Sequence, residues 1–223
     1  MDKIFNLDSP LMQVLNKITD LIWLNILTMV CCMPVITAGA ALTAQHYVVL
    51  KMVRNQEGYI ARSFFKSFKT NFRQATCIWL IILAFILMFA GDLYIFTYSE
   101  MEFPQILVIL VCAAAIILSL VGVYIFPVLA RFDNNIKNTI KNSFIIAIIS
   151  LPRTIAMILV TALPVILLYV SLRLLPISAL LGFSGPAYLC ALLYNSVFKK
   201  FEPGDEDEAE TEAESKADQK QKG

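Results

Sequence analysis

The sequence predicts an all-α membrane protein, a polytopic bundle of transmembrane helices. Three observations lead to this fold class: 58% of the 223 residues are hydrophobic, only 16% are charged, and the mean hydropathy is +0.71. The apolar residues gather in several runs separated by short polar links. A hydrocarbon layer of about 30 Å requires roughly 20 apolar residues per helix, so these runs are long enough to cross it, and no large soluble domain fits between them.

The first apolar region, residues 18–53, contains a helix break formed by Pro34, Thr37 and Gly39. As one helix it would be about 50 Å long, which is too long for one upright crossing. One interpretation is a single kinked helix, which gives five crossings in total. The other, which we favour, is a tight hairpin of two shorter helices meeting at an outward turn, which gives six. Pro cannot continue a helix, and Gly accepts unusual backbone dihedrals.

Four further spans are predicted from uninterrupted apolar runs, at residues 76–97, 104–127, 154–172 and 176–198. Pro164 lies inside the third of these, and the Gly185-Pro186 pair lies inside the fourth. Proline removes a helical hydrogen bond, so both spans should be kinked or broken, which membranes tolerate when neighbouring helices satisfy the freed backbone groups.

The charge of the links predicts the orientation, because cytoplasmic loops of membrane proteins collect Lys and Arg. The Lys and Arg residues of the body concentrate in three segments, which we therefore place in the cytoplasm: 51–75, 131–153 and 199–200. The link 98–103 contains acids and no Lys or Arg, so it should face outward. Lys3 and Lys17 favour a cytoplasmic N-terminus, and both termini are then on the same side.

Polar side chains within apolar spans are costly and often mark a pathway. The candidates are Gln45, His46 and Asp92. In a structural role, His46 would hydrogen-bond Asn25 or Thr28 of the preceding helix, and Asp92 would pair with Arg173. In a functional role, the break before Gln45 would be a re-entrant loop beside a polar cavity, with His46 as a proton-sensitive group and Asp92 as a cation-binding one.

Residues 61–75 have the pattern of an amphipathic cytoplasmic helix. One face carries Phe64, Phe65, Phe68 and Phe72, and the adjacent face carries Arg62, Lys66, Lys69 and Arg73. Such a helix should lie in the headgroup region of the bilayer with its rings buried. The competing interpretation is a docking helix for a protein partner. A weaker echo of the pattern precedes the span 154–172, with Ile136, Ile140, Phe144, Lys137 and Lys141.

The composition changes sharply after residue 201. Residues 202–223 contain nine acidic and three basic residues and almost no large apolar side chains. This composition predicts a disordered acidic cytoplasmic tail. The chain therefore divides into a transmembrane helical domain, residues 1–201, and this tail.

The sequence contains no pattern typical of an enzyme or a cofactor site. There is no phosphate-binding glycine loop, no HExxH and no GxSxG. The five cysteines lack the spacing of a metal site. The basic links are what membrane topology alone produces, so nucleic acid is not an expected partner. We expect a non-enzymatic protein without metal or cofactor, and the sequence sets no oligomeric state.

A Pro-x-x-Thr-x-Gly pattern occurs at Pro34, Thr37 and Gly39, and it is accompanied by the segments "FFKSFKTNFRQA", "PVLARFDNNIKNTIKNSF" and "NSVFKKFE". Together these residues resemble the YesL-like family of uncharacterised bacterial membrane proteins, over nearly the whole chain except the acidic tail. The resemblance implies a multi-pass protein of the bacterial plasma membrane. It also implies an accessory role in sugar uptake beside the subunits of a carbohydrate ABC transporter. The alternative is a small autonomous transporter of a solute or ion that uses the polar residues at the broken helices.

Overall fold

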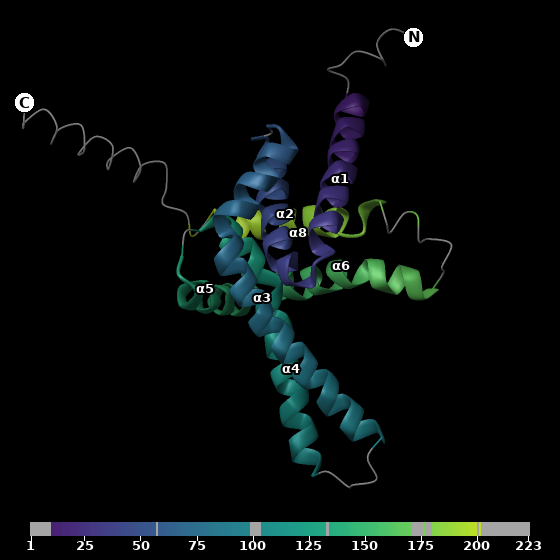
Figure 1. Cartoon of the computed structure of the whole chain (residues 1–223), viewed down its shortest axis with the longest axis vertical. Coiled ribbons are helices and arrows are strands. Elements are labelled where there is room, and N and C mark those ends of the chain that lie inside the picture. Colours follow the sequence, from purple (N-terminus) through teal and green to yellow (C-terminus); the bar gives the residue numbers. More distant parts are fainter. Residues whose placement is uncertain are drawn as a thin grey trace, which may run out of the picture.

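The computed structural model describes residues 10–56, 58–98, 104–132, 134–170, 176, 180–199 and 201, and over these residues the regular structure is helical (Figure 1). The elements are α1 (Pro10–Cys32), the short 3-10 helix η1 (Val35–Thr37), α2 (Ala38–Val53), α3 (Ile60–Tyr98), α4 (Gln105–Arg131), α5 (Ile136–Ile149), α6 (Leu151–Val170) and α8 (Ser184–Phe198). The all-α prediction is confirmed. The predicted tail, residues 202–223, lies outside the described residues.

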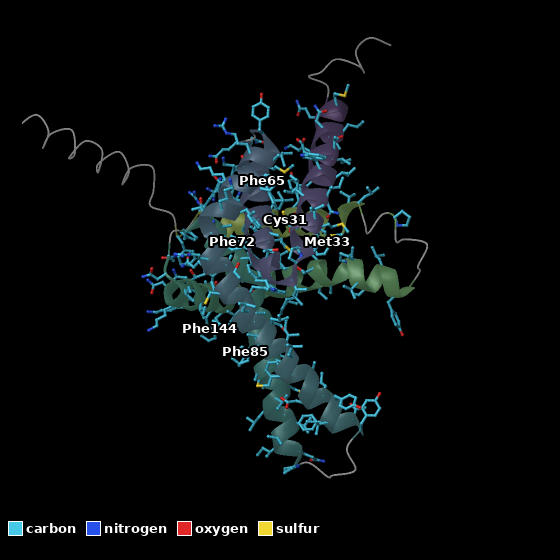
Figure 2. All side chains as sticks on the ribbon, viewed as in Figure 1. Cys31, Met33, Phe65, Phe72, Phe85 and Phe144 are labelled. Carbon is cyan, nitrogen blue, oxygen red and sulfur yellow. The ribbon has the colours of Figure 1, made fainter. Side chains whose placement is uncertain are left out.

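Three of these helices, α1, α3 and α4, are long and apolar enough to cross a membrane, and the bent pair α5 and α6 makes up to four. The apolar side chains of the outer halves of α3 and α4 are largely exposed, and Figure 2 shows Phe85 on this part of the molecule, where it is 43% exposed. Large apolar side chains on such a surface require an apolar solvent. The structure is that of a membrane protein.

The helix break at Pro34 produces the predicted hairpin of α1 and α2 rather than one kinked helix (Figure 1). Proline has no N–H, so α1 ends before it. The Thr37 hydroxyl is shared between the Cys31 carbonyl, at 2.6 Å, and the Pro34 carbonyl, at 2.9 Å. It thereby satisfies a carbonyl left open at the end of α1. Gly39 lies within α2 and no described glycine has positive φ, so the expected unusual dihedral there was wrong.

Helix α3 runs without interruption over 39 residues. The predicted amphipathic helix 61–75 and the predicted span 76–97 are therefore one element, and the boundary between them does not exist. At 1.5 Å per residue, α3 is about 58 Å long. This is roughly twice the thickness of the hydrocarbon layer.

Helix α2 lies at the centre of the fold and is buried on several sides. One core cluster joins it to α8 and α1 and includes Ala44, Val48 and Tyr194. A second cluster joins Ala40 to α3 and α4 through residues such as Ala75 and Ile125. The small side chains of α2 allow this because they let neighbouring backbones approach closely.

The chain turns by 104° between α5 and α6. Pro152 follows the corner, and the residue before a proline is disfavoured in the helical region. The Thr154 hydroxyl lies 3.0 Å from both the Ala147 and Ser150 carbonyls, at the end of α5. The corner repeats the arrangement at Pro34, where a proline stops a helix and a following threonine satisfies the open carbonyls. Beyond the corner, α6 and α8 run across the direction of α3 and α4 (Figure 1).

The predicted six crossings are not confirmed. The turn between α1 and α2 touches the middle of α3, where the Trp79 indole N–H donates to the Val35 carbonyl at 2.7 Å. The hairpin of α1 and α2 therefore lies beside the first half of α3, and the outer halves of α3 and α4 extend beyond it (Figure 1). Two hairpins stacked end to end along a helix of about 58 Å do not both span the same layer of about 30 Å.

Candidate functional site

A cavity of about 680 Å³ lies where α2, α4, α6 and α8 meet. This volume is in the usual range for small-molecule sites. Most of the wall is aliphatic or aromatic. The polar side chains on the wall are Gln45 and His46 of α2, Ser119 of α4, Thr161 of α6 and Cys190 of α8. The cavity therefore combines an apolar body with a small number of hydrogen-bonding groups.

His46 connects the cavity wall to α8. Its Nδ1 lies 3.3 Å from the hydroxyl of Tyr194, and the two rings meet edge to face with centroids 5.9 Å apart. Tyr194 is fully buried. The sequence prediction that His46 bonds Asn25 or Thr28 was wrong, because the partner comes from a helix 148 residues later in the chain.

Gln45 is only 1% exposed, and its amide nitrogen has no hydrogen-bond partner among the described residues. A buried amide that leaves its donors unused costs free energy, of the order of 1–3 kcal/mol. Such groups are uncommon in folded proteins and call for an explanation. Six buried polar side-chain atoms have no hydrogen-bond partner among the described residues, and Gln45 is the one of these residues that lies on the cavity wall.

Two prolines that were expected to break helices, Pro164 of α6 and Pro186 of α8, line the same cavity. Pro164 is inside α6 and lines the cavity, and having no N–H it leaves the Val160 carbonyl without its usual helical donor. Gly185 and Pro186 lie in the first turn of α8, where a missing N–H costs nothing. They start that helix, so the expected break inside it was wrong.

The start of α8 is fixed by a side chain from α1. The Asn25 side-chain oxygen accepts backbone N–H groups of Phe183, at 2.9 Å, and Ser184, at 3.0 Å. These are orphan donors of a helix N-terminus. Asn25 is fully buried. The cap holds the α8 wall of the cavity against the first helix of the chain.

Asp92 does not belong to this site. It lies on α3, about 20 Å along the helix axis beyond Trp79, and it is partly exposed. It is absent from the residues that line the cavity. Its predicted partner, Arg173, lies outside the described residues. The structure therefore brings together Gln45 and His46, and it separates them from Asp92.

The phenylalanine face of residues 61–75 points into the protein. Phe64 is fully buried in the core, and Phe68 and Phe72 pack against the two core clusters. Only Phe65 is well exposed, at 42%. The expectation that all four rings form a lipid or partner surface was wrong, because α2 already covers most of that face. The cations of the adjacent face are all exposed: Arg62, Lys66, Lys69 and Arg73.

Three residues of this site carry no signal in the sequence: Thr161 and Cys190 on the cavity wall, and Tyr194 behind His46. Tyr194 is one of eight tyrosines in an apolar chain. Thr161 and Cys190 lie within 3.7 Å of each other across α6 and α8, yet neither has a distinctive neighbour in sequence. Gln45 and His46 were identifiable because polar side chains are rare in apolar runs.

Two comparisons with known proteins both match the chain to proteins of unknown function. The model of a family described as "Protein of unknown function, DUF624" matches residues 21–93, which include the helix break, Gln45, His46 and the basic half of α3. The "Uncharacterized protein YesL" of Bacillus subtilis (strain 168) is 30% identical over 152 residues, which is 68% of each chain. No solved structure is significantly similar to the chain.

Proposed function

On the premise that this chain belongs to the YesL-like family of uncharacterised membrane proteins, we propose that it is a non-enzymatic, multi-pass protein of the bacterial plasma membrane that binds a small solute in the cavity beside His46. The observation that carries the proposal is that Gln45, a buried amide with unused donors, lies on the wall of this cavity. Solute transport by the chain itself is the natural extension, since α6, which contains Pro164, borders the same space. The described wall contains no Asp, Glu, Lys or Arg, which favours a neutral solute over an ion.

Two glycines offer a matched test of the binding site. A Cβ atom built on Gly122 or on Gly91 meets nothing within 4 Å, but only Gly122 lines the cavity. Gly122→Leu should fill part of the cavity while leaving the fold intact, and Gly91→Leu should leave the cavity open. Native mass spectrometry of protein purified in mild detergent would reveal a small molecule that copurifies with the parent chain and with Gly91→Leu. Equal retention of that molecule by Gly122→Leu would place its binding elsewhere.

A second candidate function is that of an accessory subunit of a carbohydrate ABC uptake system. It is favoured by the exposed cations Arg62, Lys66, Lys69 and Arg73 on the first half of α3, next to the exposed ring of Phe65. A stripe of cations with an aromatic anchor is suited to an acidic protein surface or to anionic lipid.

Copurification from the native membrane tests whether the exposed cations and Phe65 of α3 bind a protein partner. With Phe65→Asp and Lys66→Glu combined, ATPase or permease subunits that accompany the parent chain should be lost. Lys137→Glu on α5 is the control for a general loss of positive charge. Recovery of the same subunits with the α3 variant would exclude the α3 stripe as their docking site.

We also propose that the basic segments 51–75, 131–153 and 199–200 face the cytoplasm and that the link after Tyr98 faces outward. This proposal is supported by helix α3, whose basic first half and whose end at Tyr98 lie at opposite ends of the molecule (Figure 1). The placement of both termini in the cytoplasm rests on the charge pattern alone. Single cysteines at Gln56 and at Gln105, in a chain without its native cysteines, should react with a membrane-impermeant maleimide from opposite sides of the membrane.

A further inference from the structure

We infer that the cavity takes an uncharged, largely apolar molecule that carries a hydrogen-bond acceptor, such as a ketone, ester or amide carbonyl, and that it does not take a sugar; this inference rests on the solute-binding function proposed above. The apolar body of the ligand follows from the wall. Most of the lining side chains end in methyl groups or rings, among them Leu42, Val123, Phe126, Ile158, Val165 and Phe183.

The first hydrogen-bond donor for the ligand comes from His46. Tyr194 is fully buried, and among the described residues the hydrogen-bond partner of its hydroxyl is the Nδ1 atom of His46. A phenol keeps its proton at neutral pH. If Nδ1 carried the ring proton, the phenolic hydrogen would have no acceptor in the described part of the chain, at a cost of about 1–3 kcal/mol.

The hydroxyl of Tyr194 therefore donates to Nδ1, and the proton of the neutral imidazole is on Nε2. Because His46 lines the cavity and its Nδ1 is engaged by Tyr194, Nε2–H is the donor that the ring can offer to a ligand. Gln45 lies beside His46 on α2, and its buried amide nitrogen, which has no partner in the described residues, can donate to a ligand once the side chain turns toward the cavity. Both groups can donate, and both belong to α2 on one side of the wall.

The remaining hydroxyls on the wall already donate their hydrogens to backbone carbonyls. Ser119 donates to the Ala115 carbonyl at 2.9 Å, and Thr161 donates to the Met157 carbonyl at 2.7 Å. A sugar would bury several hydroxyls that each need both a donor and an acceptor, and an unpaired buried hydroxyl is costly. A single carbonyl on an apolar body needs only the donors on α2, so the chemistry of the wall matches that class.

Benzophenone is a suitable probe, because it is an apolar ketone that inserts into nearby C–H bonds when irradiated. The full chain would be placed in lipid nanodiscs, labelled with benzophenone under light, and digested for mass spectrometry. We expect adducts on peptides that line the cavity. Excess dibenzyl ketone should suppress these adducts, whereas the hydrocarbon 1,3-diphenylpropane, which lacks the carbonyl, should compete about fivefold less well, as expected for one neutral hydrogen bond. Maltose should have no effect.

Two variants remove the proposed donors while keeping apolar volume, His46→Phe and Gln45→Met. Each should weaken competition by dibenzyl ketone about fivefold and leave competition by the hydrocarbon unchanged. Ser119→Ala is the matched control, since it removes a wall hydroxyl that is already engaged, and it should behave as the parent.

The outcomes separate this inference from the function on which it rests. Equal competition by ketone and hydrocarbon, or suppression of cavity adducts by maltose, would overturn the ligand class and leave a solute site in place. Absence of adducts in the cavity of the folded parent chain would overturn both. A shift in competition that is the same for Ser119→Ala as for His46→Phe would also refute the assignment of the donors.

Discussion

Gly39 of α2 lies so close to Trp79 of α3 that a Cβ atom on Gly39 would come within 2.5 Å of the Trp79 Cβ atom and 2.6 Å of the Ala75 carbonyl oxygen. The Trp79 indole then reaches the turn and binds the Val35 carbonyl. The glycine of the Pro-x-x-Thr-x-Gly pattern is therefore required by the crossing of two helices. The proline and threonine of the same pattern end α1 and satisfy its carbonyls.

Replacing Gly39 by alanine should destabilise the protein by about 1–3 kcal/mol, because the added methyl group collides with backbone and with a Cβ atom that cannot turn away. Reversible unfolding in mixed micelles with SDS measures this free energy. Gly91→Ala on α3 is the control. Its methyl group meets open space, and it should be neutral or stabilise by up to about 1 kcal/mol, since Gly is a poor helix former. Equal stability of the two variants would refute the close crossing.

Phe64 and Phe65 are neighbours in sequence with opposite environments, fully buried and 42% exposed respectively. Phe64→Ala should cost about 3–5 kcal/mol, because it removes a core ring and leaves a cavity. Phe65→Ala should cost less than about 1 kcal/mol. The midpoint of thermal unfolding in one detergent compares the two variants directly. A larger loss for Phe65→Ala would mean that the face of α3 toward α2 has been assigned incorrectly.

Asn25→Leu should destabilise the protein by about 2 kcal/mol or more. The change removes the oxygen that accepts the N–H groups of Phe183 and Ser184 and leaves buried donors without a partner. Hydrogen exchange of the first turn of α8 should rise specifically. Ile26→Ala, at a neighbouring position that is 41% exposed, controls for any change in α1. Unaltered exchange at residues 183–186 in Asn25→Leu would show that the cap does not hold this helix end.

His46 and Tyr194 should be energetically coupled. A double-mutant cycle of His46→Phe and Tyr194→Phe should give a coupling of about 1 kcal/mol, the net value of one neutral hydrogen bond. A control cycle pairs His46→Phe with Tyr98→Phe, at the far end of α3, where the side chain is 73% exposed. The losses of unfolding free energy in this control cycle should be additive. Additivity in the first cycle would remove the basis for assigning the imidazole proton to Nε2.

The two helices with an apolar and a basic face show where sequence reasoning stopped. In α3 the aromatic face turns inward, and Phe64 is buried. In α5 two of the three corresponding apolar residues face outward: Ile140 is 38% and Phe144 is 44% exposed. Ile136 packs against the second core cluster, and Thr139 and Ser143 are fully buried. The apolar face of this pattern therefore packs against the protein in α3 and is largely exposed in α5. Lipid tails and a protein interior are both apolar, so the pattern cannot distinguish between them.

The cavity was only partly predictable for a similar reason. A polar side chain in an apolar run is visible in the sequence, which is how Gln45 and His46 were identified. Their surroundings are not visible, because Tyr194 and Cys190 come from a helix about 150 positions away in the chain. The α6 wall, including Thr161, is placed by the 104° corner before it, and no local pattern specifies that angle.

By itself the sequence determined the class of the protein, the end of its first helix at Pro34, and its polar positions. These follow from local chemistry: apolar runs cannot remain in water, and Pro34 cannot continue a helix. Tertiary structure alone decided that residues 61–75 continue into the span behind them, that Gly39 meets Trp79, and that His46 meets Tyr194. Those relationships depend on which apolar surface each helix covers, and the choice is made by the fit of shapes between helices distant in the chain.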